Sequence, residues 1–132
     1  MRAAALLLLL LLGLVLAGCG GGDDEGDVET VLKDFAKAVT ESDGKRFCND
    51  LVTREYLEKT VGATGDNAVE QCEKQIDSLQ QGSFKIAKFD KIEIDDDRAT
   101  VTAQVETQGR TSPQVFRLEK QDGKFRLTSN QP

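Results

Sequence analysis

Residues 84–107 read FKIAKFDKIEIDDDRATVTAQVET, and this stretch decides the fold. Its second half alternates apolar with polar residues, the apolar ones being Ala99, Val101, Ala103 and Val105. A period of two is typical of a β-strand with one buried face. In the first half Phe89 is out of phase with the other apolar residues, which predicts a bend or bulge near Lys88 to Asp90. We therefore predict two antiparallel strands joined by a hairpin turn at DDDR, residues 95–98.

Two more strands are expected after this hairpin. Residues 108–112 are interpreted as a loop, and Pro113 suits the first residue of a strand. Residues 114–128 read QVFRLEKQDGKFRLT, in which Asp122-Gly123 is a typical hairpin turn. The side chains expected to face inward are Phe116, Leu118, Phe125 and Leu127. The C-terminal half therefore predicts a four-strand antiparallel meander.

Before Ser83 the apolar period changes from two to 3.6, which predicts helices. The first helix is expected from Asp27, as its N-cap, to Glu41. Its apolar residues form one stripe, made of Val28, Val31, Leu32, Phe35, Ala36 and Val39. Helices followed by a meander favour an α+β fold, with the N-terminal helices packed on one face of a curved four-strand antiparallel sheet.

Three further helices are expected between the first one and the sheet. A short one covers residues 47–51, and another follows Thr53 as its cap and stops at Gly62. The last is expected to begin at Asp66 or Asn67 and to end at Gly82. Its apolar stripe consists of Ala68, Val69, Cys72, Ile76 and Leu79.

Residues 1–18 are typical of a secretory signal, with Arg2 at the start, an apolar run and a small-residue exit. The segment is at the short limit of the ~17–25 residues that a transmembrane helix needs. Residues 16–19, LAGC, resemble the lipobox of bacterial lipoproteins at all four positions. The resemblance implies that Cys19 carries diacylglycerol and becomes the new N-terminus. The alternative is a chance cysteine at the end of an ordinary signal peptide.

Residues 19–26 are then interpreted as the lipidated cysteine and a flexible acidic tether, GGGDDEG. Such a tether has a root-mean-square reach of about 15 Å. Two acyl chains anchor a protein stably to a bilayer. We expect residues 27–132 to form one domain on the extracytoplasmic face of the bacterial cell membrane, with the membrane as a partner through the anchor.

Lipidation of Cys19 leaves only Cys48 and Cys72 among the three cysteines. Outside the cytoplasm these two are expected to form a disulfide, the alternative being two buried free thiols. Both lie on apolar faces of expected helices, so the bond would join the second helix to the last one. The sequence contains no His and no C-x-x-C, which makes a zinc site improbable.

The formal net charge of the 132-residue chain is −6, and Arg2 is the only charged residue before Cys19. Such a surface repels nucleic acid and anionic lipid headgroups, so neither is an expected ligand. Asp95, Asp97 and Glu106 match three positions of a calcium loop. Thr100 stands where that loop needs glycine, so no metal is expected there.

The order of elements, the bent first strand, DDDRATVTAQV and the closing DGKFRL resemble the nuclear transport factor 2-like (NTF2-like) superfamily, over roughly residues 27–128. More narrowly, the chain is similar to small envelope lipoproteins of high-GC Gram-positive bacteria, which share a CNDLVT-like cysteine (residues 48–53 here), a second cysteine before the sheet and a closing hairpin. The resemblance implies a cone-shaped pocket between sheet and helices. Enzymes of the superfamily use an acid or a tyrosine there.

The candidate pocket residues in this chain are Tyr56, Asp77 and Asp90. Tyr56 is alternatively interpreted as a core tyrosine. Asp90 is alternatively interpreted as a turn residue beside the strand bend. No His, no G-x-S-x-G, no phosphate-binding glycine loop and no H-E-x-x-H occurs, so no catalytic residue and no cofactor is predicted.

We therefore favour a non-catalytic, membrane-tethered module that binds another envelope protein or an apolar ligand. The alternative, from another functional class, is a small hydrolase- or isomerase-like enzyme of the same fold that uses a pocket Asp or Tyr. A purely structural role is the third interpretation.

Overall fold

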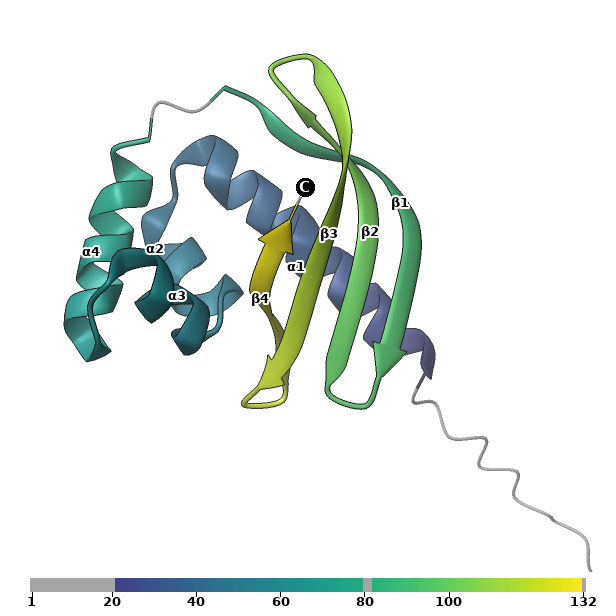
Figure 1. The fold of residues 1–132 in the computed structure, drawn as a ribbon, viewed down its shortest axis with the longest axis horizontal. Helices are drawn as coiled ribbons and strands as arrows, with labels where there is room; N and C mark the ends of the chain where they lie inside the picture. Colours follow the sequence, from purple (N-terminus) through teal and green to yellow (C-terminus); the bar gives the residue numbers. More distant parts are fainter. Residues whose placement is uncertain (1–20, 80–81, 132) are drawn as a thin grey trace, which may run out of the picture.

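Four antiparallel strands form one curved sheet in the order β1-β2-β3-β4 (Figure 1). The computed structural model describes residues 21–79 and 82–131. The strands are β1 (Phe84–Asp95), β2 (Arg98–Thr107), β3 (Arg110–Gln121) and β4 (Lys124–Gln131). Before them come α1 (Gly21–Glu41), α2 (Gly44–Arg46), the π-helical turn η1 (Phe47–Leu51), α3 (Arg54–Val61) and α4 (Gly65–Asp77). Helix α1 crosses one face of the sheet, and the shorter helices gather beside β4.

The first hairpin has the predicted turn and the predicted irregularity. Asp95 pairs with Arg98, and the register between β1 and β2 shifts twice, between Ile86 and Lys88 and again between Phe89 and Lys91. Each shift lets the strand bend while its apolar side chains stay on the inner face. Phe89 therefore packs against the core although it is out of phase in the sequence.

The third strand begins earlier than predicted. Gln108 and Gly109 alone form the turn, with φ values of 52° and 77°, and β3 starts at Arg110. Two successive residues with positive φ make a tight hairpin turn, so the loop predicted for residues 108–112 is wrong. Pro113 lies inside the strand opposite Gln104, in a part of β3 that β4 does not reach. A missing N–H is tolerated at such an edge position.

Helix α1 begins at Gly21 instead of Asp27, so most of the predicted tether is helical. Near its start Asp24 Oδ1 lies 3.1 Å from Lys120 Nζ of β3. An acidic residue in the first turns of a helix is also favoured by the helix dipole. The predicted signal segment and Cys19 lie outside the described residues.

Helix α3 begins and ends where the sequence predicted, whereas both ends of α4 differ from the prediction. The Thr53 hydroxyl caps α3 by accepting from Tyr56 N, and Gly62 ends it in the left-handed conformation. Helix α4 starts after Thr64 and ends at Asp77, five residues before the predicted Gly82. Its end tightens because Leu79 N–H bonds to Ile76 O, and Leu79 is 36% exposed instead of facing the core.

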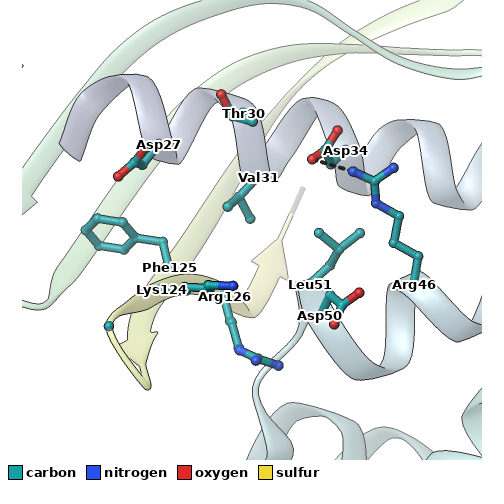
Figure 2. A pocket seen from close by; sticks show the side chains of 11 residues that line it. Asp27, Thr30, Val31, Asp34, Arg46, Asp50, Leu51, Lys124, Phe125 and Arg126 are labelled. Carbon is teal, nitrogen blue, oxygen red and sulfur yellow. Dashed lines mark ion pairs between the residues drawn. The ribbon is translucent and has the colours of Figure 1, made fainter. Parts of the chain in front are cut away.

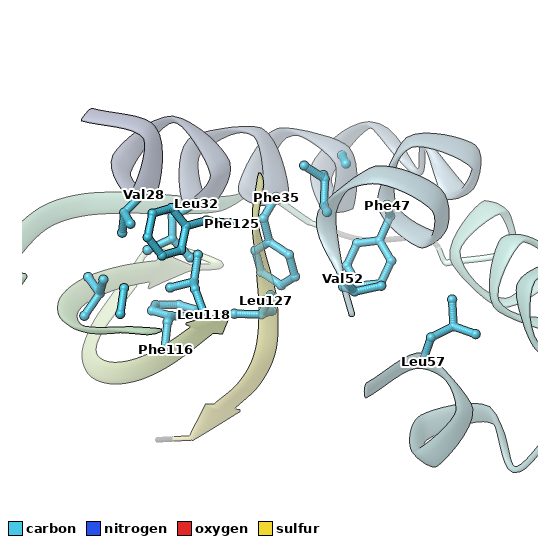
Figure 3. Close-up of a cluster of buried hydrophobic side chains, with 14 of the residues drawn as sticks. Val28, Leu32, Phe35, Phe47, Val52, Leu57, Phe116, Leu118, Phe125 and Leu127 are labelled. Carbon is cyan, nitrogen blue, oxygen red and sulfur yellow. The ribbon is translucent and has the colours of Figure 1, made fainter. Parts of the chain in front are cut away.

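The core lies between α1 and the inner face of the sheet and continues under η1 and α3 (Figure 3). The Phe35 ring is at its centre, with ring centroids 5.3 Å from Phe47, 5.8 Å from Phe84 and 6.2 Å from Phe116. The predicted inward residues of β2, β3 and β4 are all buried. Val52 forms a parallel bridge with Leu127, which joins the helical part to the β4 edge.

The predicted disulfide is present. Cys48 of η1 and Cys72 of α4 are bonded, with their Cα atoms 6.0 Å apart. Both residues are buried. The bond therefore joins the second helical segment to the last helix, as the apolar stripes predicted.

Candidate functional site

A pocket of about 180 Å³ lies between α3 and α4, next to the disulfide. We call it the Tyr56 pocket. Its lining is mostly apolar and consists of Phe47, Val52, Tyr56, Leu57, Thr60, Val61, Cys72, Gln75 and Ile76. These side chains meet because the amphipathic faces of α3 and α4 pack against each other beside the capped start of α3. Of the three candidate pocket residues, Tyr56 is the one placed in this pocket.

Burial raises the pKa of the Tyr56 phenol above its ordinary value, and a hydrogen bond with Thr60 opposes the rise. The Thr60 hydroxyl also donates to the backbone oxygen of Tyr56, at 2.7 Å. The phenol is therefore neutral at physiological pH. It can donate or accept a hydrogen bond, but it is a poor base.

Asp77 lies at the end of α4 and acts on the backbone of α2. Its Oδ1 accepts a hydrogen bond from Gly44 N at 2.9 Å. It does not line the Tyr56 pocket. Its carboxylate instead helps to hold α2 against α4.

Asp90 lies on the exposed side of β1, in the bulged region. Its carboxylate accepts from Gln104 Nε2 at 2.6 Å and lies 3.6 Å from Lys88 Nζ. It does not line the Tyr56 pocket either. The alternative, that Asp90 belongs to the strand bend, agrees with this position, and the structure does not bring Tyr56, Asp77 and Asp90 together.

A larger cleft of about 530 Å³, the α1–β4 cleft, lies between α1, η1 and β4 (Figure 2). Its lining carries both signs of charge, from Asp27, Asp34, Arg46, Asp50, Lys124 and Arg126. Arg46 Nη2 lies 2.7 Å from Asp34 Oδ2. This cleft could not be predicted from the sequence, because its side chains come from distant segments that share no local pattern.

Within residues 21–79 and 82–131, no group of three or more His, Cys, Asp or Glu side chains is placed to hold a metal ion. The partial calcium pattern is spread over the hairpin: Asp95 pairs with Arg98 near the turn, whereas Glu106 pairs with Lys85 near the other end. In the same described part of the chain, no helix has the length and apolar character needed to cross a membrane.

No protein-family model and no curated protein matches the sequence, but solved structures share the fold. An NTF-2 like protein of unknown function from Silicibacter pomeroyi DSS-3 has a TM-score of 0.54 at 13% identity, over 82% of this chain and 92% of its own. One from Shewanella oneidensis MR-1 has a TM-score of 0.52 at 19% identity, over 80% and 95%. A de novo designed protein with a curved β-sheet has a TM-score of 0.50 at 18% identity, over 78% and 95%.

At these identities the similarity concerns the fold. The helices, the curved four-strand sheet and the strand order are those of an NTF2-like α+β protein, as the sequence predicted. The function of this chain depends on its own side chains, because one fold serves many functions.

Proposed function

We propose that this chain is a membrane-anchored extracytoplasmic lipoprotein whose NTF2-like domain binds a ligand without chemically changing it. The anchor rests on the sequence of residues 1–19, above all on the lipobox-like LAGC that ends at Cys19. The binding role rests on the Tyr56 pocket.

The composition of the Tyr56 pocket is the observation that carries this proposal. None of its described lining residues is a carboxylate, a lysine, an arginine or a histidine. Proton transfer needs a group whose pKa lies near the working pH, and a phenol whose pKa is raised by burial is further from it. Binding is therefore favoured over acid–base catalysis.

The volume of the pocket limits the ligand to a small apolar group. At about 180 Å³ it is close to the ~150 Å³ of an apolar cavity that binds benzene. Tyr56, Thr60 and Gln75 add polar atoms to the lining that can orient a polar substituent. We propose that the occupant is a single aromatic ring or an aliphatic group of the same size.

Titration with benzene and with phenol, followed by methyl NMR of Leu57, Val61 and Ile76, tests this proposal. Saturable shifts confined to these methyl groups are expected. Val61→Phe would fill the pocket and abolish the shifts, whereas Val115→Phe, on β3 and outside the pocket lining, would keep them. Methyl resonances that do not respond to either probe would refute the pocket as a ligand site.

A further inference from the structure

Among the described residues of this acidic chain, Arg54 and Arg126 are two arginines that form no ion pair and line the same cleft. The formal net charge is −6, and several basic side chains of the described residues pair with an acid, as Arg46 does with Asp34 and Lys120 with Asp24. Arg54 and Arg126 form no such pair within residues 21–79 and 82–131. Unpaired guanidinium groups that share one cavity attract an anion, even where the distant field of the protein opposes it.

Both arginines line a cleft of about 440 Å³ between η1, the start of α3 and the β3–β4 hairpin. We call it the Arg54–Arg126 cleft. Its other polar lining residues are Asn49, Gln121 and Asp122, and it shares only Val52 and Leu57 with the Tyr56 pocket. Asp122 lies in the hairpin turn and forms no ion pair with either guanidinium among the described residues.

The guanidinium of Arg126 is held in place on one side. Its Nη1 donates to the backbone oxygen of Asn49. The Asn49 side chain is itself fixed, since its Nδ2 donates to Lys45 O and to Glu73 Oε1, each at 2.8 Å. The other edge of the guanidinium, formed by Nε and Nη2, remains available for a ligand. Its Nε–H is buried and has no acceptor among the described residues. That edge is the fork that binds carboxylate or phosphate with two hydrogen bonds.

Arg54 contributes the second charge from the first residue of α3. Arg54 is an exposed residue and forms no ion pair within residues 21–79 and 82–131, so its guanidinium can turn toward an anion in the cleft. The positive end of the α3 dipole adds a smaller attraction at the same place.

We propose that the Arg54–Arg126 cleft binds the phosphate or carboxylate group of a small anionic solute. The anion lies between the two guanidinium groups and accepts from the Nε–Nη2 edge of Arg126. This inference does not rest on the proposed binding of an apolar group, because the polar groups that bind the anion do not line the Tyr56 pocket.

The test is a titration of the full-length, disulfide-bonded protein with sodium phosphate and with sodium succinate at constant ionic strength, followed through the arginine Nε–Hε NMR signals. The signals of Arg54 and Arg126 are expected to shift saturably. Arg54→Gln should weaken binding about tenfold or more, as expected for a lost charged hydrogen bond. Arg110→Gln removes the same charge from the exposed first residue of β3 and should change affinity less than about twofold.

Equal, non-saturating shifts in the parent protein and in both variants would overturn the proposal, as would no shift at all. Arg126→Gln, checked for folding by circular dichroism, should also lose binding. Vesicles of phosphatidylglycerol distinguish the source of the anion. If they bind through Arg54 while free phosphate and succinate do not, the small-solute proposal is wrong and the anion is a lipid headgroup.

Discussion

At the scale of single residues, Gly44 and Asp77 explain how the helical layer packs so closely. Gly44 N donates to Asp77 Oδ1, and a Cβ atom on Gly44 would lie 2.6 Å from both that oxygen and Glu73 O. The backbone oxygen cannot move away as the end of a flexible side chain can. Glycine is therefore required where α2 meets α4.

Gly44→Ala is predicted to destabilise the protein by about 1–3 kcal/mol, because the added methyl group forces α2 away from α4. Chemical denaturation of the oxidised protein measures this. Gly26→Ala is the matched control, since a Cβ there meets nothing within 4 Å in α1. The control should stabilise the protein by roughly 0.5–1 kcal/mol through helix propensity. Equal effects of the two substitutions would contradict the close packing at Gly44.

Tyr56 is predicted to make stability depend on pH in the alkaline range. Burial raises the pKa of its phenol in the folded protein above the ordinary value of 10.0. The folded state therefore keeps this proton more tightly than the unfolded state. The resulting stability is fully present below pH ~10 and is lost as the pH rises through the folded pKa.

Urea denaturation between pH 8 and pH 11 compares the parent protein with Tyr56→Phe. The two proteins share every other ionisable side chain, so the difference between the two curves isolates the phenol. The parent protein should lose more stability than the variant above pH ~10. Parallel curves would show that the phenol titrates alike in the folded and unfolded states.

At the scale of elements, η1 is the segment that connects the helical part to the sheet. This single π-helical turn buries Phe47, Cys48 and Leu51, and the chain then reaches the Val52–Leu127 bridge at the edge of β4. Thr53 N donates to Leu127 O at 2.9 Å, just before α3 begins. The disulfide from Cys48 then holds α4 against the same turn.

Cys48→Ala combined with Cys72→Ala is predicted to lower the free energy of unfolding by about 3.5 kcal/mol, in the chain-entropy model. The bond closes a loop between residues 24 positions apart, which restricts the unfolded chain. Denaturation curves of the oxidised protein and the double variant measure the loss. A change below about 1 kcal/mol would mean that packing of α4 alone supplies its stability.

At the scale of the whole molecule, the start of α1 determines how far the domain stands from its proposed anchor. The described part of α1 begins at Gly21, which is two positions after Cys19 in the sequence. A lipid on Cys19 would therefore hold the first turn of α1 near the bilayer. The distance between the proposed lipid and the domain would be much shorter than a flexible tether of residues 19–26 would allow.

Cys19→Ser is predicted to release the protein from the membrane fraction, because a serine cannot carry the thioether. Intact-mass spectrometry of the parent protein should find a chain that begins at Cys19 and carries diacylglycerol. Cys48→Ser together with Cys72→Ser is the control, since it removes the other two thiols and should leave the protein in the membrane fraction. A parent protein that begins at another residue, or that lacks the lipid mass, would refute the anchor.

Local patterns in the sequence determined much of this molecule. The alternation of apolar residues from Ala99 to Val105 predicted β2, the Asp122-Gly123 pair predicted the last turn, and Thr53 and Gly62 marked both ends of α3. These features were predictable because each depends on residues within a few positions. The disulfide was predictable because only Cys48 and Cys72 remain when Cys19 is assigned to the expected lipid anchor, which leaves one pairing.

Tertiary structure alone decided the features that join distant segments. The start of α1 is held by an ion pair between residues 96 positions apart, Asp24 and Lys120, and Asp77 bonds to a backbone amide 33 positions away, at Gly44. The clefts at Arg126 likewise take side chains from α1, η1, α3 and β4. Hydrophobic period and turn chemistry describe neighbours along the chain, whereas these sites depend on which charged groups the packing of the core brings within hydrogen-bond distance.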